Sequence, residues 1–483
     1  MSAQTAIKPS MQAKSFNANV RAALSNRTLQ EALGGLDDGL VARRRSAVGG
    51  VADFEALRNQ GQAIRDATLA QLDQHLETFE RNAQLAGSVV HWASTAEQAR
   101  EIILELCQKA RAHLVTKGKS MVSEEIELNA HLQAAGIETI ETDLGEYILQ
   151  LRGEMPSHII APAIHLTQGD VEADFRRHHT HLPADRIFTD AASVVAEARS
   201  IMREKFLNAD VGITGANFLV AETGSCVIVT NEGNGDLTQS LPSLHIVLAS
   251  IEKVVATLND TAVLLRLLAR SATGQDMAAY TTFSTGPRRA SDPDGPEACH
   301  IVLLDNGRSA LLAGDFRDVL RCIRCGACMN HCPVYQAIGG HAYSSVYPGP
   351  IGAALTPALD GLEANRDLPQ ASTFCGRCEE VCPVKIPLVT LMRQWREQDF
   401  STGLTPIRQR LGLKVWGYFA KRPRLYRVAA RFAIAVLGAM GRRRGHFTYL
   451  PFVSAWTRTR DLPAPQGRTF QQLWQETKRG VPR

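Results

Sequence analysis

The chain has 483 residues, of which 45% are hydrophobic and 21% are charged, and its formal net charge is +4. This balance is that of a globular protein, and the length exceeds the roughly 250–300 residues that one hydrophobic core supports, so we expect two or three domains. The sequence has no uncharged apolar run of about 18 residues, and Met1–Lys8 lacks the apolar core of a secretory signal. We therefore expect a cytoplasmic protein without a membrane span.

The N-terminal part of the sequence predicts helices. Residues 1–30 have no acidic residue and four basic ones, Lys8, Lys14, Arg21 and Arg27. This composition suits either a mitochondrial transit peptide or a helical arm, and we favour the arm. Apolar residues recur at helical spacing as far as about residue 110, and the Arg43–Arg45 run before a Gly-Gly pair indicates an exposed break between helices. We assign residues 1–95 to a helical N-terminal region.

Short strands alternate with helices from about residue 112, which predicts an α/β domain with a mainly parallel sheet over residues 96–305. The expected strands are 112–116, 137–141, 244–249, 280–284 and 300–304. The expected helices are 123–135, 193–208 and 251–272. Two β-rich runs, 218–221 and 226–230, flank Glu222-Thr-Gly224 and predict a hairpin with a polar tip.

Seven of the ten cysteines stand in two short runs, which is a metal-binding density. Cys322–Pro333 reads C-I-R-C-G-A-C-M-N-H-C-P and has the spacing of bacterial ferredoxins. Cys375–Pro383 reads C-G-R-C-E-E-V-C-P and repeats the last three cysteine positions. Soft thiolates at these spacings suit inorganic iron–sulfur clusters. We predict an α-helical, ferredoxin-like module with two [4Fe–4S] clusters over residues 306–400.

The ferredoxin pattern divides the cysteines between the two clusters, because the last cysteine of each run reaches across to the other cluster. One cluster is predicted to bind Cys322, Cys325, Cys328 and Cys382. The other is predicted to bind Cys332, Cys375 and Cys378. Ser372 stands where an eighth cysteine is expected. Its cluster would then be ligated by serine oxygen or by a partner, be open to substrate or water, or lack one iron.

A zinc site is the alternative reading of these cysteines, since four of them would satisfy one tetrahedral ion. Seven cysteines at interleaved spacing exceed that need, so we favour clusters. Arg321 and Arg324 flank the first run, and we expect their charge to favour the reduced, more negative cluster. No flavin or nicotinamide fingerprint is visible in the sequence.

Six segments carry a resemblance to a known family: Ile213–Asn217 (ITGAN), Ala221–Gly224 (AETG), Tyr347–Gly352 (YPGPIG), Cys375–Cys378 (CGRC), Cys382–Ile386 (CPVKI) and Arg460–Pro465 (RDLPAP). With them, the chain resembles the iron–sulfur protein family of the bacterial lactate-utilisation system over nearly its whole length. That family joins a LUD-type domain, similar in fold to sugar-phosphate isomerases and CoA transferases, to a two-cluster ferredoxin module. The cysteine runs alone occur in many redox subunits, so the specific signal is their union with the LUD-like half.

The resemblance implies an electron-transfer subunit, and so a non-autonomous oxidoreductase subunit, of a complex that oxidises L-lactate to pyruvate. It implies two partner subunits, one with a cysteine-rich domain and a second of the LUD type, while the electron acceptor stays unknown. Two alternatives stay open. In the first, the substrate is glycolate or another 2-hydroxy acid. In the second, the chain is a scaffold or assembly subunit in which the clusters chiefly stabilise the fold.

Outside the cysteine runs the sequence offers weak candidates for a site. Glu222 is the best candidate for a substrate or acid–base group, although a glutamate at a hairpin tip is more often simply solvated. The His178-His179-Thr-His181 run could bind a metal, but an exposed loop is favoured. The isolated Cys107, Cys226 and Cys299 are predicted to be small buried hydrophobic residues.

The C-terminal region, residues 401–483, is strongly basic, whereas the rest of the chain is acidic. It has 17 Lys and Arg against 2 Asp and Glu, which leaves 36 against 47 for residues 1–400. Aromatic residues are interleaved with the arginines: Trp416, Tyr418, Phe419, Tyr426, Phe432, Phe447, Tyr449, Phe452 and Trp456 with Arg422, Arg424, Arg427, Arg431 and Arg442–Arg444. This composition predicts a basic helical tail that binds a partner protein. It also suits peripheral contact with a membrane surface, whereas nothing in it reads nucleic-acid bases.

Overall fold

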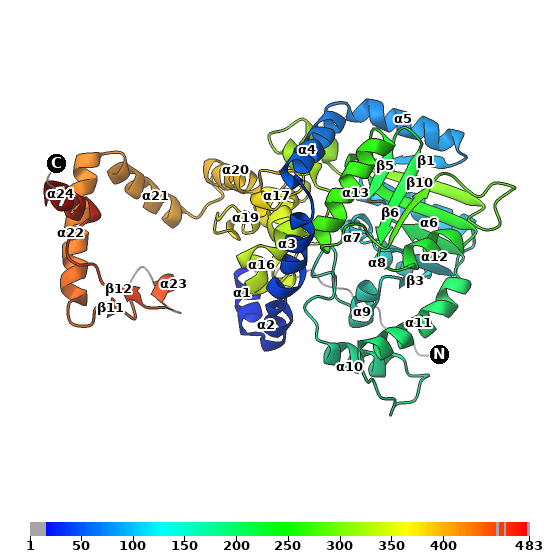
Figure 1. The fold of residues 1–483 in the computed structure, drawn as a ribbon, viewed down its shortest axis with the longest axis horizontal. Helices are drawn as coiled ribbons and strands as arrows, with labels where there is room; N and C mark the ends of the chain where they lie inside the picture. The colour runs from blue at the N-terminus through cyan, green and yellow to red at the C-terminus, as the bar shows by residue number, and fades with distance from the viewer. Residues whose placement is uncertain (1–15, 451–453, 458–459, 481–483) are drawn as a thin grey trace. The chain divides into compact units, whose positions relative to one another are not determined.

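The computed structural model describes residues 16–450, 454–457 and 460–480. The chain divides into two compact units, Met1–Gln398 and Asp399–Arg483 (Figure 1). Residues 1–15, with Lys8 and Lys14 of the transit-like composition, lie outside the described residues. Within the described ranges, no helix is both long enough and apolar enough to cross a membrane.

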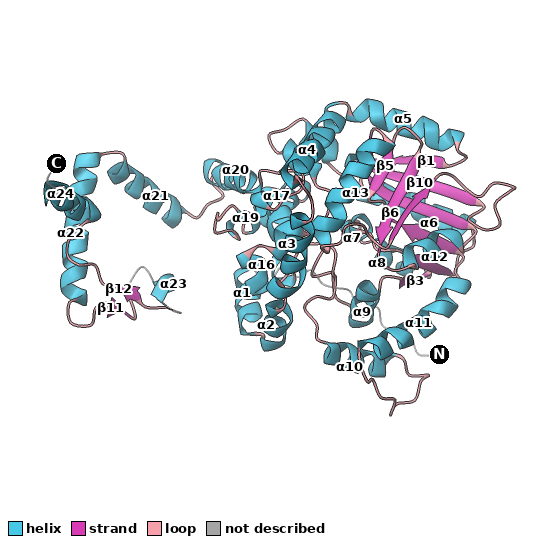
Figure 2. Cartoon of the chain, viewed as in Figure 1, coloured by secondary structure: helices cyan, strands magenta, loops and turns pink. Residues whose placement is uncertain are grey.

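A six-stranded, fully parallel sheet forms the centre of the first unit (Figure 2). Its strand order is β1 (Val89–Ala93), β10 (Ala298–Leu304), β7 (Leu244–Ser250), β4 (Val211–Thr214), β2 (Leu114–Lys117) and β3 (Glu138–Glu141). The central strands β7 and β4 are buried throughout, as expected of a parallel sheet that is covered on both faces. The predicted parallel sheet is confirmed. The expectation of helices up to about residue 110 is wrong at β1, which lies on the sheet edge.

A second sheet of four strands contains the predicted hairpin. Its order is β8 (Val254–Val255), β5 (Phe218–Val220), β6 (Ser225–Thr230) and β9 (Tyr280–Ser284). Strands β5 and β6 pair antiparallel, so the hairpin is confirmed. The helix predicted over 251–272 is wrong at its start, because a 3₁₀ turn and β8 come first. Helix α13 begins at Leu258, where the Thr257 side chain accepts the N–H of Asp260.

Helices cover the two sheets. In the N-terminal region they are α1 (Phe16–Ser25), α2 (Arg27–Gly34), α3 (Ala42–Gly49), α4 (Phe54–Ala70) and α5 (Leu72–Leu85). In the α/β region they are α6 (Ala96–Lys109), α7 (Met121–Glu125), α8 (Leu128–Ala134), α9 (Leu144–Arg152), α10 (Gln168–His178), α11 (Ala191–Leu207), α12 (Asn234–Ser240), α13 (Leu258–Ala272) and α14 (Arg308–Leu312). Cys107, Cys226 and Cys299 are buried among these elements, as predicted.

The predicted break between helices is confirmed at the exposed Gly-Gly pair, where α3 ends, but the Arg43–Arg45 run is not part of it. The run lies inside α3, and Arg44 is buried with its Nη2 donating to the carbonyl of Val381 at 2.9 Å. Arg58 of α4 likewise donates from Nε to the carbonyl of Cys382 at 2.9 Å. The N-terminal helices therefore hold the second cysteine run in place rather than forming a free arm.

The cysteine module is built of short helices and turns. They are a 3₁₀ turn Arg317–Arg321, α15 (Ala327–Asn330), α16 (Pro333–Ile338), a 3₁₀ turn His341–Tyr343, α17 (Gly349–Leu359), α18 (Leu362–Asn365), a 3₁₀ turn Leu368–Gln370, α19 (Arg377–Glu380) and α20 (Leu388–Ser401). The expectation that the segment from Gly339 to Gly352 has no regular element is wrong at both ends. Pro350 occupies the first turn of α17, where its missing N–H has no helical partner to lose.

The second unit is mainly helical. Its elements are α21 (Ile407–Ala420), α22 (Pro423–Gly441), β11 (His446–Phe447), α23 (Ser454–Thr457), β12 (Leu462–Pro463) and α24 (Phe470–Gly480). Strands β11 and β12 pair antiparallel. Within this unit Val428, Phe432, Val436 and Met440 recur every four residues along α22 and are exposed, which gives that helix an apolar stripe. Phe452 of the predicted aromatic set lies outside the described residues.

Candidate iron–sulfur centres

The seven cysteines of the two runs gather around two cavities of the first unit, in the groups that the ferredoxin pattern predicts. The first cavity is lined by Cys322, Cys325, Cys328 and Cys382. The second is lined by Cys332, Cys375 and Cys378, together with Ser372 and Thr373. Each cavity therefore takes cysteines from both runs. The last cysteine of each run lies with the other run, although about fifty residues separate Cys332 from Cys382.

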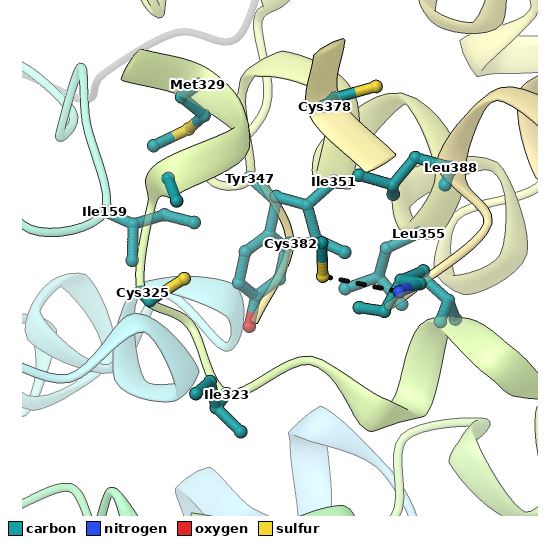
Figure 3. Packing of buried hydrophobic residues seen from close by; sticks show 14 of the residues in the cluster. Ile159, Ile323, Cys325, Met329, Tyr347, Ile351, Leu355, Cys378, Cys382 and Leu388 are labelled. Carbon is teal, nitrogen blue, oxygen red and sulfur yellow. Dashed lines mark hydrogen bonds between the residues drawn. The ribbon is translucent and has the colours of Figure 1, made fainter. Parts of the chain in front are cut away.

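The first cavity is enclosed by apolar side chains. Figure 3 shows the sulfurs of Cys325 and Cys382 among Ile159, Ile351 and Leu388, which also line the cavity. Ile159 comes from the α/β region, in the segment between α9 and α10, while the other lining residues belong to the module. These apolar side chains limit the exposure of the sulfurs, and Ile159 makes the α/β half part of the site.

Some of the residues at the second cavity are exposed. Cys375 is exposed and the side chain of its neighbour Phe374 is 38% exposed, whereas Cys332 and Cys378 are buried. Arg396 of α20 lies over the Phe374 ring at 3.9 Å and donates from Nη2 to the carbonyl of Ser372 at 3.1 Å. These contacts fix the turn that carries Ser372.

Backbone geometry relates the two cavities as repeats of one motif. Arg324 and Phe374 stand immediately before Cys325 and Cys375, and both have left-handed φ angles of 60° and 55°. The glycines that follow, Gly326 and Gly376, also lie in the left-handed region, at 73° and 82°, which glycine adopts without a steric cost. Each glycine directly precedes a four-residue helix, α15 or α19. The same turn thus presents the cysteines of both runs.

Backbone N–H groups point at the sulfurs, as iron–sulfur sites require. The N–H of Arg324 donates to Cys322 Sγ at 3.4 Å, and that of Ile386 donates to Cys382 Sγ at 3.3 Å, a bond drawn in Figure 3. Burial and the neighbouring sulfurs raise the pKa of Cys325 to about 12, and burial raises that of Cys382 to about 11. Free thiols here stay protonated at neutral pH, so a bound metal must displace these protons. Seven soft sulfur donors, amide N–H groups and an apolar lining fit iron–sulfur clusters.

A buried chain of charges joins the first cysteine run to the carboxyl ends of the parallel strands. Arg308 follows β10 and forms a bidentate pair with Glu125, Nη1–Oε1 at 2.9 Å and Nη2–Oε2 at 2.7 Å. Its Nε lies 2.9 Å from Glu252 Oε2, and Glu252 Oε1 lies 3.3 Å from Arg324 Nη2. Tyr347 closes the chain, since its hydroxyl donates to Glu125 at 2.6 Å and its ring lies under the Arg324 guanidinium at 4.6 Å. Glu252 is ionised, because Arg308, Arg324 and Lys253 outweigh the opposing effect of burial and lower its pKa to about 2.

Two further cations, which the sequence analysis missed, lie buried near Cys322. Arg65 of α4 donates to the carbonyls of Val254 and Leu320, each at 3.0 Å. Burial, with help from Arg324, lowers the pKa of Lys253 to about 8, while Glu252 and Cys322 act in the opposite direction. Neither has a signal in the sequence, since each lies more than sixty residues from the two cysteine runs. Arg321, which the sequence did identify, pairs with Asp66 and Asp318.

The two weak candidates of the α/β half have other contacts. Glu222 is exposed at the hairpin tip, and its Oε2 accepts the N–H of Leu258, the first residue of α13, at 2.8 Å. It lines neither cavity. In the histidine run only His179 is buried, and its two ring nitrogens lie 2.9 Å from the Tyr147 hydroxyl and 2.7 Å from Glu197. These contacts are helix capping and core packing.

Three family models match the chain. The LUD domain covers residues 76–304, the 4Fe-4S dicluster domain residues 318–386, and the C-terminal domain of lactate utilisation protein B residues 401–479. A Lactate utilization protein B of Geobacillus sp. (strain WCH70) is 41% identical over 467 residues, which are 96% of this chain and 98% of that protein. The protein of the same name from Lysinibacillus sphaericus (strain C3-41) is 39% identical over 467 residues, 96% and 97% of the two chains. The Uncharacterized electron transport protein YkgF of Escherichia coli (strain K12) is 41% identical over 472 residues, 96% and 98% of the two chains.

Proposed function

This chain belongs to the family of lactate utilization protein B, and on that premise we propose that it is the iron–sulfur electron-transfer subunit of a complex that oxidises L-lactate to pyruvate. The observation that carries the proposal is the pair of cysteine cavities, one lined by apolar side chains that include Ile159 of the α/β half and one with an exposed cysteine. A chain that passes electrons needs such a sheltered site and such an accessible one.

We assign one [4Fe–4S] cluster to each cavity. Cys322, Cys325, Cys328 and Cys382 are the ligands of the first cluster. Cys332, Cys375 and Cys378 are three ligands of the second. Bound clusters of this kind accept and release single electrons. The protein contributes the thiolates, the N–H groups that stabilise charge on the sulfurs, and the apolar side chains that limit the exposure of the first site.

Ser372 is our candidate for the fourth ligand of the second cluster. Its Oγ accepts the N–H of Phe374 at 3.1 Å, which corresponds to the bond from the Arg324 N–H to Cys322 Sγ in the first run. Ser372 therefore presents its oxygen with the same local backbone contact as Cys322 presents its sulfur. Because Ser372 also lines the second cavity, we propose a cluster held by three thiolates and one serine oxygen.

Replacement of Ser372 by alanine should make one iron of the second cluster labile. On mild oxidation we expect S372A to lose one iron per chain and to develop the EPR signal of a three-iron cluster, while wild type and S372C keep all their iron. T373A is the matched control, because this neighbouring hydroxyl lines the same cavity. If wild type loses iron as readily as S372A does, the position is open to water and the serine is not a ligand.

We place the exchange of electrons with a partner at the second cluster, since Cys375 and Phe374 are exposed there. The first cluster is the sheltered one. The buried charges of Arg65, Lys253 and Arg324 lie on its side, with Glu252 among them, and cations stabilise the more negative, reduced state. This arrangement favours the first cluster as the one that holds the electron in the partly reduced protein.

Partners bind, on this proposal, through the second unit as well. The apolar stripe of α22 is flanked by arginines, and such a combination is enriched at the cores of protein interfaces. We assign this surface to the two other lactate-utilisation subunits, one with a cysteine-rich domain and one of the LUD type. The same surface would also suit peripheral contact with anionic lipid.

The proposal is tested by reducing the clusters with substrate. In a complex reconstituted with both partner subunits, L-lactate should bleach the visible absorption of the clusters. A parallel sample with glycolate decides the substrate class, because equal bleaching by both acids would make this a general 2-hydroxy-acid system.

A further inference from the structure

Glu154, His165 and His341 meet where the segment between α9 and α10 contacts the cysteine module. Glu154 Oε2 lies 2.9 Å from His165 Nε2. The His165 and His341 rings are 4.4 Å apart between centroids and are inclined by 64°. One ligand atom from each of the three residues lies within 4.8 Å of the other two. None of the three lines a cysteine cavity, so this cluster of side chains is a separate feature.

The contacts of the two histidines indicate which ring nitrogen of each is available to an ion. His341 Nε2 lies 2.7 Å from the carbonyl of Met155, which can only accept, so Nε2 carries the proton. At His341 the distal N–H is thus held by a carbonyl and Nδ1 keeps its lone pair, which is how metal-binding histidines are oriented. His165 Nε2 lies 2.9 Å from Glu154 Oε2, so an ion shared by these two residues binds between these atoms in place of the proton that they share.

The protonation state of Glu154 also suits a cation. Burial raises the pKa of Glu154, but His165 and Arg152 outweigh it and bring the value to about 2, so the group is a carboxylate. Arg152 Nε donates to Glu154 Oε1 at 2.9 Å and its Nη1 donates to Asp174 Oδ2 at 2.6 Å, which leaves Glu154 Oε2 to face His165.

We propose that Glu154, His165 and His341 bind a divalent transition-metal ion. Two imidazole nitrogens and one carboxylate oxygen are the donor set of zinc sites with an open fourth position, and also suit Fe²⁺. His341 is exposed, so solvent can deliver the ion and occupy the open position. The ion would fasten the segment that carries Ile159 to the turn at His341, where the Gly340 N–H already donates to Ser157 Oγ at 3.2 Å. This metal site is independent of the ligand assignment of the two clusters.

The test is zinc binding by the full chain with its clusters in place, so that the cysteines are not free to take the metal. Anaerobic protein is treated with a chelator, desalted, titrated with Zn²⁺ by equilibrium dialysis, and assayed for zinc, iron and sulfide. We expect about one zinc per chain in wild type, and a loss of affinity in H341A greater than the roughly 10- to 100-fold that removal of an outer partner costs. H178A is the control, because this histidine is exposed and belongs to the other histidine run.

A second variant, E154Q, distinguishes the loss of metal binding from misfolding, since an amide preserves the shape and part of the hydrogen bonding of the carboxylate. It should bind zinc more weakly than wild type while its cluster iron and sulfide stay unchanged. If the purified protein instead carries one iron in excess of sulfide-bound iron, and H341A lacks it, the native ion is Fe²⁺ at the same site. Wild type that binds no metal, or variants that all bind zinc as wild type does, would overturn the proposal.

Discussion

Alanine at Cys325 will remove the first cluster and leave the second. Cys325 is buried in the wall of the first cavity, and a cluster that loses one of four thiolates there has no neighbouring donor to replace it. We expect about half of the iron and sulfide of wild type, and the loss of one of two reduced-state EPR signals. The matched control is C226A, which removes an equally buried thiol from the α/β half and should keep both clusters.

The interleaving of the two runs gives this experiment its sharpest form. Cys382 lies in the second run but lines the first cavity, while Cys375 lines the second. C382A should therefore lose the same EPR signal as C325A, and C375A should lose the other one. If C382A behaves like C375A, each run binds its own cluster, and the ligand assignment is wrong.

Replacing Arg308 with methionine will destabilise the fold strongly. The Arg308 side chain is fully buried between the carboxylates of Glu125 and Glu252, and its loss leaves two buried negative charges without their main partner. Breaking a buried ion pair in this way costs about 3–5 kcal/mol of the free energy of unfolding. The measurement is urea unfolding of the cluster-loaded protein, followed by the loss of cluster absorption and of helical circular dichroism.

R393M is the control for this variant, because the Arg393–Glu397 pair is exposed on both sides and should contribute less than about 1 kcal/mol. The pH dependence follows from Glu252, whose pKa is depressed in the folded protein. Its contribution to stability is fully present above the ordinary pKa of glutamic acid and is lost as pH falls toward 2. In R308M the loss of the arginine raises the pKa of Glu252 in the folded protein. The difference in the free energy of unfolding between R308M and wild type should therefore become smaller as pH falls below neutrality. An R308M protein as stable as R393M would contradict the account of this network.

Local spacing is the part of the site that sequence alone can predict. Three of the four cysteines that we assign to the first cluster lie within seven residues of sequence, so the positions of Cys322, Cys325 and Cys328 predict their chemistry directly. The comparison of the two runs even identifies Ser372 as the residue at the vacant cysteine position. The parallel sheet was predictable for a similar reason, because buried strands and helices alternate along the chain.

The surroundings of the first cavity could not be predicted, because they come from segments far apart in the sequence. Three examples from different parts of the α/β half and the N-terminal helices are Ile159, Glu252 and Arg65. Only the folded structure brings each of them close to the first cysteine run. Arg44 shows the limit of composition as a guide. An arginine in a basic run is usually solvated, but this one is buried because a backbone carbonyl of the module accepts its guanidinium.

The most direct test of the central claim is the EPR spectrum of the complex after rapid mixing with L-lactate. The complex is reconstituted with both partner subunits, shown to form pyruvate, and frozen during turnover without added acceptor. We predict that the reduced-cluster EPR signals of this chain appear in the wild-type complex. In the complex with C375A, the signal that we attribute to the second cluster should be missing. A complex that forms pyruvate while both clusters of this chain stay oxidised would contradict the account and leave the clusters a purely structural role.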